Sequence, residues 1–245
     1  MSDLKLYNYF RSSTSYRVRI ALHYKNLNFE YKPIHLLNNG GEQNSTEYRH
    51  INPIGGVPTL IHNQYVISQS FAIIEYLDEA FPNTPQLING SVYDRAKIRQ
   101  LCENINADIH PLQNLKVMQY LEKQHQYDQQ QKNSWCQKWI VDGLRATEKL
   151  IESLAVAHNE QYKMQSNMQT NEKLNTDIQY CYGTKITAAD LFLIPQMVSA
   201  ERFLVDIKQF KTLYQIYQNC LTMSAFQKAH PFCQVDTPDD LKKII

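Results

Sequence analysis

Three consecutive hydroxyl side chains, those of Ser12, Ser13 and Thr14, stand directly before a run in which apolar residues recur at helical spacing. The N-terminus of a helix carries unpaired N–H groups and the positive end of the helix dipole, and both favour an anion. One hydroxyl would serve as the N-cap, and a second, turned outward, would donate a hydrogen bond to a negative sulfur or oxygen of a ligand. Taken alone, the stretch fits simple N-capping better, because Ser and Thr are favoured there in any case.

Two further stretches favour a ligand-binding role over simple N-capping. In NPIGGVPTL, residues 52–60, a loop ends in Val57-Pro58 immediately before a strand. A cis bond between these two residues would turn the backbone N–H and C=O groups of Val57 outward, toward a peptide-like ligand. Gln69 and Ser70 begin the next helix and offer a second helix N-terminus for a carboxylate, although a capping role explains Ser70 about as well. Together the three stretches suit a small peptide that carries a thiol and carboxylates.

Short strands and helices alternate in the part of the sequence that contains these stretches. Residues 4–9 and 28–34 alternate in the strand sense on either side of a helical run, which predicts a crossover unit with parallel strands. Residues 58–67 predict an antiparallel hairpin, and residues 70–81 predict a helix. We therefore expect an α/β domain over residues 1–82.

A linker over residues 83–91, which contains Pro85 and the pair Asn89-Gly90, leads into long helical patterns without a convincing strand. We expect residues 92–245 to form an all-helical domain. Thr187 and Asp190 predict a capping box, which stabilises a helix rather than forming a site. Residues 158–180 contain eight Asn or Gln residues and few strong core residues. They predict a polar, mobile insertion, and an extension of the preceding helix is the less favoured alternative.

The composition argues against several classes of function. The formal net charge is +1 with acids and bases interleaved, which argues against nucleic acid as the main partner. The five cysteines never show CxxC spacing and the eight histidines form no HExxH motif, so we expect structural thiols and no metal site. No run approaches the about 20 apolar residues of a membrane span, and the N-terminus lacks a signal-peptide pattern. We therefore expect no membrane association and a cytoplasmic location.

Several motifs give the sequence a resemblance to a known family. VPTL, QS and ITAADL are similar to motifs of the cytosolic glutathione transferases. RSSTSYRVRIAL, HPLQNLKV, SAERFLVD and HPFCQVDTPDD look most like the zeta class, the maleylacetoacetate isomerases. The resemblance covers nearly the whole chain except the insertion rich in Asn and Gln. It implies a thioredoxin-like α/β N-terminal domain followed by an all-α C-terminal domain.

The resemblance also implies a reaction and its cofactor. The reaction is the cis–trans isomerisation of a maleyl diacid, such as maleylacetoacetate in tyrosine and phenylalanine catabolism, with glutathione as the cofactor and a homodimer as the assembly. A thiolate that adds reversibly to the conjugated C=C bond makes that bond single, so that it can rotate. The family's pattern assigns to glutathione the residues Ser12, Ser13, Gln43, Val57, Gln69, Ser70, Gln113 and Asn114. Ser12 is expected to face the sulfur, with Ser13 and Thr14 completing the catalytic group.

The diacid and the enolate formed from it need positive charge nearby. Arg202 matches a substrate-site arginine of the family, and Arg17 and Arg11 are further candidates. Arg19 is expected to be a solvated or ion-paired side chain without a role in the site.

Position 14 departs from the family's pattern, because the zeta class typically has Ser-Ser-Cys where this chain has Ser12, Ser13 and Thr14. Threonine supplies a hydroxyl but no second thiol, so we expect altered rates rather than lost chemistry. Two alternatives stay open at this point. One is a glutathione transferase or dehalogenase that consumes glutathione with small halo-acids, and the other is a non-catalytic binding protein with the same fold.

Overall fold

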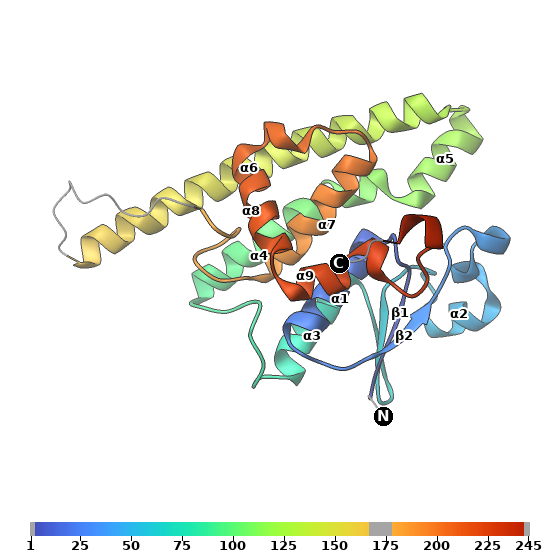
Figure 1. Cartoon of the computed structure of the whole chain (residues 1–245), viewed down its shortest axis with the longest axis horizontal. Helices are drawn as coiled ribbons and strands as arrows, with labels where there is room; N and C mark the ends of the chain where they lie inside the picture. The colour runs from blue at the N-terminus through green and yellow to red at the C-terminus, as the bar shows by residue number, and fades with distance from the viewer. Residues whose placement is uncertain (1–2, 167–177, 243–245) are drawn as a thin grey trace. The chain divides into compact units, whose positions relative to one another are not determined.

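The structure is a computed structural model that describes residues 3–166 and 178–242 (Figure 1). The chain divides into two compact units. Unit 1 comprises Met1–Ile88 together with Leu221–Ile245, and unit 2 comprises Asn89–Cys220. None of the helices in the described part of the chain combines the length and the apolar character needed to cross a membrane.

A four-stranded mixed sheet forms the centre of unit 1. Its strands are β1 (Leu4–Asn8), β2 (Glu30–Pro33), β3 (Thr59–His62) and β4 (Tyr65–Ser68). They lie in the order β2-β1-β3-β4, with β1 parallel to β2 and antiparallel to β3, and with β3 antiparallel to β4. The predicted crossover, hairpin and thioredoxin-like fold are confirmed.

Helix α1 is enclosed within unit 1. The helices of this unit are α1 (Ser13–Tyr24), α2 (Thr46–Ile51), α3 (Ser70–Ala80) and α9 (Ser224–Ala229). Both α3 and α9 pack against α1. Every residue of α1 from Ser15 to Leu22 is buried, so the middle of this helix has no solvent-facing side. Two arginines within that stretch are therefore buried side chains.

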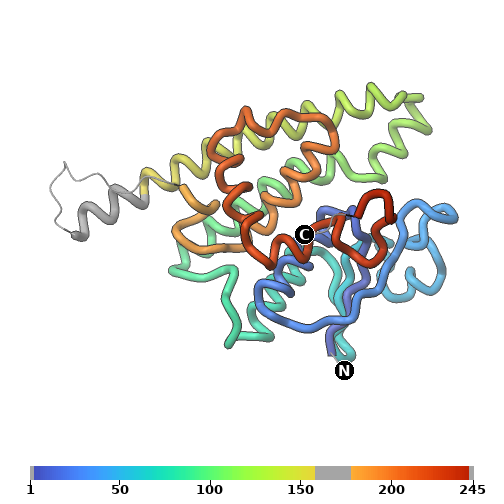
Figure 2. Tube along the Cα trace, viewed as in Figure 1, coloured from blue at the N-terminus to red at the C-terminus, as the bar shows by residue number. Residues whose placement is uncertain are grey.

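The C-terminal segment, residues 221–242, belongs to unit 1 rather than to the helical unit in which the sequence placed it. Its chain trace returns alongside α1 in Figure 2. Tyr16 Oη donates to the carbonyl oxygen of Phe226 at 3.2 Å, and Arg19 Nε donates to that of Ala229 at 3.0 Å. The reason for the difference is that the segment completes the covering of α1, a contact between residues about 210 positions apart in the sequence.

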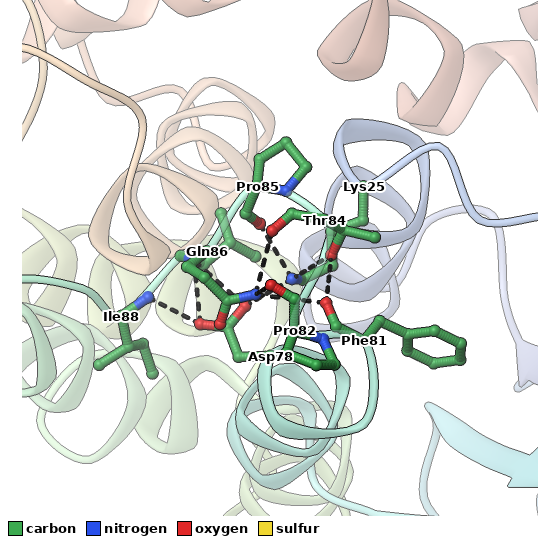
Figure 3. Close-up of polar contacts among 9 residues, drawn as sticks. Lys25, Asp78, Phe81, Pro82, Thr84, Pro85, Gln86 and Ile88 are labelled. Atoms are coloured by element: carbon green, nitrogen blue, oxygen red, sulfur yellow. Dashed lines mark hydrogen bonds and ion pairs between the residues drawn. The ribbon is translucent and has the colours of Figure 1, made fainter.

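Most of the expected linker, residues 83–91, is bound to unit 1 by one buried ion pair (Figure 3). Lys25 Nζ lies 2.7 Å from Asp78 Oδ1, and the Lys25 side chain has no exposed surface. Lys25 also donates to Thr84 Oγ1 and to the carbonyl of Pro85, each at 2.9 Å. The Asp78 carboxylate accepts the N–H groups of Leu87 and Ile88 at 2.8–3.1 Å. Unit 1 therefore extends to Ile88.

Unit 2 contains helices and no strand among its described residues. Its helices are α4 (Val92–Asn106), α5 (Leu115–His125), α6 (Gln129–Ser166), α7 (Ala188–Arg202) and α8 (Lys211–Leu221). Helix α4 packs against α7 and α6. The predicted capping box is confirmed, with Asp190 Oδ2 accepting the N–H of Thr187 at 2.8 Å. Asp190 Oδ1 also accepts the N–H of Cys181 at 2.8 Å, so this buried carboxylate fixes the approach to α7.

The first part of the expected polar insertion is helical. Helix α6 continues to Ser166, so residues 158–166 extend the preceding helix and the less favoured alternative is correct for them. Asn and Gln are compatible with a helix that has already been nucleated over the preceding turns. Residues 167–177 of the expected insertion lie outside the described residues.

Candidate active site

Ser12 is the N-cap of α1. Its φ and ψ are −69° and 120°, outside the helical range, and its Oγ accepts the N–H of Ser15 at 3.1 Å. Capping uses a lone pair of the hydroxyl oxygen and leaves the O–H hydrogen available to donate. The expected division between a capping hydroxyl and a separate ligand-facing hydroxyl is therefore unnecessary, because one side chain can do both. Ser12 and its neighbour Ser13 are both half-buried.

Thr14 joins Ser12 to the loop that precedes β3. Thr14 Oγ1 donates to the carbonyl oxygen of Val57 at 3.0 Å, and it lies 2.9 Å from Ser12 Oγ. A carbonyl only accepts, so the single hydroxyl hydrogen of Thr14 is directed to Val57. Ser12 must then be the donor in its contact with Thr14. The result is a directed chain of hydrogen bonds from Ser12 through Thr14 to Val57.

The Val57–Pro58 peptide bond is cis, which is the condition for the ligand-binding role expected of this loop. Tyr48 Oη and Asn52 Nδ2 both donate to the carbonyl oxygen of the adjacent Gly56, at 2.7 and 2.9 Å. The loop is therefore held from two sides, by α2 and by its own first residues. Val57 itself is half-buried.

Gln69 and Ser70 begin α3, and their backbone is unusual. Gln69 has φ = 73° and ψ = 118° and an exposed side chain. A non-glycine residue with such a positive φ is strained, and such strain is concentrated at functional sites. Ser70 is buried, and its Oγ accepts from Arg17 Nη1 at 3.1 Å. Because a guanidinium has no acceptor atom, that contact does not use the hydrogen of the Ser70 hydroxyl.

Arg17 does not have the position that a substrate-binding residue needs. Its side chain is buried beneath α3 with 0% exposure, and its guanidinium donates to Ser70. The expectation of a direct contact with the diacid is therefore corrected to a contact that supports Ser70. The cause is the packing of α1 between the sheet and two helices, which leaves position 17 without access to solvent.

The surroundings of Arg19 also differ from those expected. It is neither solvated nor in a direct ion pair within the described residues, but buried and hydrogen-bonded to neutral oxygens. Burial lowers the pKa of Arg19, and the nearby oxygens of Tyr31, Tyr16 and Asp236 act in the opposite direction. Its guanidinium donates to Asn8, Tyr9 and Phe10, the residues that lead directly to the hydroxyl cluster.

The remaining expected residues of unit 1 are Arg11 and Gln43. Arg11 is exposed, and its guanidinium carbon lies 5.6 Å from the centre of the Phe10 ring. Gln43 is buried, and its Nε2 donates to the carbonyl of Leu36 at 3.2 Å. Its Oε1 has no hydrogen-bond partner among the described residues.

Three of the expected site residues belong to unit 2. Gln113 is buried, donates to Gln196 Oε1 at 2.5 Å and accepts from Ser199 Oγ at 3.1 Å. Asn114 is the N-cap of α5 and accepts the N–H of Lys116 at 3.1 Å. Arg202 ends α7 with an exposed side chain whose guanidinium carbon lies 4.6 Å from the centre of the Phe203 ring.

The structure thus directly joins Ser12, Thr14 and Val57 by hydrogen bonds, and joins Arg17 to Ser70. Sequence reasoning missed two residues beside this group, Asp236, which contacts the turn before Ser12, and Tyr31, which donates to Asp236. The stretch HPFCQVDTPDD, which contains Asp236, contributed to the family resemblance, but sequence reasoning assigned no role to its residues. No group of described His, Cys, Asp or Glu side chains is arranged to hold a metal ion.

Comparison with known proteins gives consistent relatives. Residues 2–79 match the family model described as the glutathione S-transferase N-terminal domain. A probable maleylacetoacetate isomerase from Vibrio cholerae is 38% identical over 96% of this chain and 99% of its own length. A maleyl pyruvate isomerase, a bacterial zeta-class glutathione S-transferase, has a TM-score of 0.81 and 34% identity over 96% of this chain and 100% of its own.

A further solved structure is that of a maleylacetoacetate isomerase from Methylobacterium extorquens with bound malonate and glutathione. It has a TM-score of 0.81 and 27% identity, and the match covers 96% of this chain and 99% of that one.

Proposed function

This chain belongs to the zeta-class glutathione transferases, the family of the maleylacetoacetate isomerases, and from this premise we propose that it catalyses the glutathione-dependent cis–trans isomerisation of a maleyl diacid. Maleylacetoacetate is the substrate we assign, and maleylpyruvate is the related diacid that an assay should include. The observation that carries the proposal is the hydroxyl of Ser12 at the N-terminus of α1, fixed by Thr14 and Val57.

The site fits glutathione on features of this chain. Gln69, strained and exposed at the start of α3, and Ser70 next to it are suited to hold a carboxylate at a helix N-terminus. Val57 offers backbone groups beside the cis peptide bond, and Gln43 has an unpaired amide oxygen. Gln113 and Asn114 are assigned to the same ligand from unit 2. When bound, glutathione supplies the thiolate that adds reversibly to the C=C bond.

Three of the five cysteines of the protein are poor sources of a thiolate. Burial raises the pKa of Cys136 to about 11, with Arg202 acting in the opposite direction. Burial also raises the pKa values of Cys181 and Cys220, and the Asp190 carboxylate raises them further. These three thiols stay protonated at neutral pH, so none of them is suited to supply the thiolate.

The task of Ser12 is to donate a hydrogen bond to a negative sulfur at the start of α1, where the helix dipole acts in the same sense. Each unit by which a thiol pKa is lowered requires about 1.4 kcal/mol of differential stabilisation. A hydrogen bond to a charged acceptor contributes about 1.5–3 kcal/mol, so a single hydroxyl is sufficient to lower the pKa of the thiol appreciably. Ser13 lies beside it, and Arg11 and Arg202 are the cations we assign to the diacid and to the negative charge that develops on it.

The substitution Ser12→Ala tests this assignment, because it removes the O–H donor. We expect kcat/KM for the isomerisation of maleylacetone, measured with glutathione, to fall by at least about 100-fold. The loss of an N-cap also costs about 1 kcal/mol of stability. Ser91→Ala is the matched control, since Ser91 caps α4 through the N–H of Asp94 at 3.2 Å and has no assigned role in the reaction.

Activity of the Ser12→Ala protein close to that of Ser91→Ala would show that another group stabilises the thiolate. Glutathione should be recovered unchanged after turnover, whereas its consumption would favour a transferase or a dehalogenase. Tight glutathione binding without turnover would favour a binding protein.

Two further proposals concern the whole protein. We propose a homodimer, and the edge strand β4 provides exposed Tyr65 and Val66 side chains that suit a protein contact. Light scattering measures the mass in solution. We also propose that the protein works in the cytoplasm, which cell fractionation tests.

A further inference from the structure

The C-terminal segment has no part in the function proposed so far, yet it reaches the turn that carries Ser12. Asp236 Oδ2 accepts the N–H of Phe10 at 3.0 Å. Asp236 Oδ1 accepts the hydroxyl of Tyr31, on β2. Phe10 is buried and precedes the N-cap Ser12 by two residues. One carboxylate from the end of the described chain therefore holds both β2 and the β1–α1 turn.

The opposite side of the same turn is held by Arg19. Its Nη1 donates to Asn8 Oδ1 at 3.0 Å and to the carbonyl of Tyr9 at 3.2 Å, and its Nη2 donates to the carbonyl of Phe10 at 3.0 Å. The Tyr9 carbonyl also accepts the N–H of Ser12 at 3.0 Å. The peptide groups before Ser12 are thus fixed on their carbonyl side by Arg19 and on their N–H side by Asp236.

The segment that carries Asp236 is itself rigidly held. Thr237 Oγ1 donates to the carbonyl of Pro231 at 2.7 Å, and both residues are buried. Gln234 Nε2 donates to the carbonyls of Lys228 and His230, each at 2.8 Å. Arg19 Nε joins the segment to α1 through the carbonyl of Ala229. The stretch HPFCQVDTPDD therefore forms a closed turn with a fixed place for its carboxylate.

We propose that Asp236 and Arg19 are positioning residues for the isomerisation, and that the C-terminal segment fixes the β1–α1 turn so that the Ser12 hydroxyl meets the sulfur. This inference rests on the proposed function. Its physical basis is that a misplacement of about 1 Å in a reacting group can cost about 100-fold in rate. Asp236 acts through the backbone N–H of Phe10, and Arg19 acts through the Asn8 side chain and the backbone carbonyls of Tyr9 and Phe10.

Two substitutions separate geometry from charge. Asp236→Ala removes the acceptor of Phe10, and we expect kcat to fall about 10- to 100-fold with a smaller change in the KM for glutathione. Asp236→Asn keeps an oxygen that accepts the Phe10 N–H, so its kcat should stay within about threefold of the unmodified protein. Tyr31→Phe removes only the second contact of Asp236 and should behave like Asp236→Asn.

Unit 2 provides a matched control. Asp94 also accepts one backbone N–H, that of Ser91 at 2.8 Å, and one tyrosine hydroxyl, that of Tyr182 at 2.6 Å. Asp94→Ala therefore loses the same kinds of contact as Asp236→Ala. Its kcat should remain near that of the unmodified protein at equal folded fraction, checked by circular dichroism.

Two readouts do not depend on isomerase turnover. Hydrogen exchange at the amides of Phe10 and Ser12 should accelerate at least about tenfold in Asp236→Ala and stay unchanged in Asp94→Ala. The thiol of bound glutathione, titrated by its thiolate absorbance, should move in Asp236→Ala toward the pKa of about 8.5 of a free thiol.

The outcomes distinguish the two proposals. Equal kcat and equal exchange in Asp236→Ala and Asp94→Ala would overturn the positioning role. A full-length protein without isomerase activity would overturn the proposed function, while the exchange and the thiol titration would still decide whether Asp236 positions Ser12.

Discussion

At the residue scale, the directions of the Thr14 and Ser12 hydroxyl hydrogens determine which side chain can donate to the sulfur. Thr14 has one hydrogen and gives it to Val57, which obliges Ser12 to donate to Thr14 in the protein without ligand. A thiolate is a stronger acceptor than a hydroxyl, so the Ser12 hydrogen turns toward the sulfur when one is present. Thr14 therefore acts through Ser12 rather than on the reacting atoms. Its hydroxyl accepts from Ser12 and donates to Val57 at the position where the family usually has a cysteine.

Thr14→Val tests this role because it keeps the shape of the side chain and removes its hydroxyl. The loss of one hydrogen bond corresponds to about 1 kcal/mol, so kcat/KM should fall about five- to tenfold. Thr14→Ser keeps the hydroxyl and should stay within about twofold, with Thr14→Cys between the two. Steady-state kinetics with glutathione and maleylacetone give these ratios, and equal values for the Val and Ser variants would contradict the role.

Some residues of the site were predictable from sequence and others were not. Ser12 as a helix start follows from the local rules of capping, whereas the cis bond at Val57 does not follow from the sequence, because cis is the minority form before proline. The roles of Arg17 and Arg19 did not follow, because a charged residue on a helix is ordinarily exposed. Arg17 is buried against α3, and Arg19 is buried against α9, which reaches α1 from a distant part of the sequence. Asp236 was missed for the same reason.

At the scale of elements, the buried pair Lys25 and Asp78 fastens the end of α3 and the following segment to α1 (Figure 3). Removing one partner of a buried ion pair leaves the other charge without compensation. Lys25→Met and Asp78→Asn should each lower the free energy of unfolding by about 3 kcal/mol, and the double substitution by less than the sum of the two.

Denaturant unfolding measures these changes. The exposed pair Lys138 and Asp142, on α6, is the matched control, with its side chains 62% and 52% exposed. Asp142→Asn should change the free energy of unfolding by less than about 0.5 kcal/mol, since solvent screens an exposed pair. A similar small effect for Asp78→Asn would show that the buried pair does not hold the linker.

The elements themselves were largely predictable from hydrophobic periodicity. Strand alternation gave the crossover and the hairpin, and the ITAADL stretch gave the capping box of α7. The continuation of α6 to Ser166 was not predicted, because composition alone favoured an irregular polar segment. Helix propagation over a long preceding run outweighed that preference.

At the scale of the whole molecule, ligand binding should appear as thermal stabilisation. Glutathione at 100 times its Kd contributes about 2.7 kcal/mol to the folded state. For a chain of this size, that free energy raises Tm by about 5–10 °C. Differential scanning fluorimetry measures the shift, and the dipeptide Cys-Gly, which lacks the γ-glutamyl end expected at Gln69 and Ser70, is the control and should give a smaller one.

An equal shift with Cys-Gly would place the γ-glutamyl group away from α3. No shift with glutathione at millimolar concentration would argue against the binding site assigned to unit 1.

Unit 1 is assembled from two stretches of chain that are separated by the whole of unit 2. A ribosome releases the first stretch long before the second, so Arg19 and the Phe10 amide are synthesised well ahead of the Ala229 carbonyl and the Asp236 carboxylate that they bind. The nascent sheet and α1 must remain soluble during that interval with one side of α1 uncovered. The turn that carries Ser12 gains its contacts to Asp236 and Ala229 only after that second stretch has been translated, so a premature stop anywhere in unit 2 removes both of them.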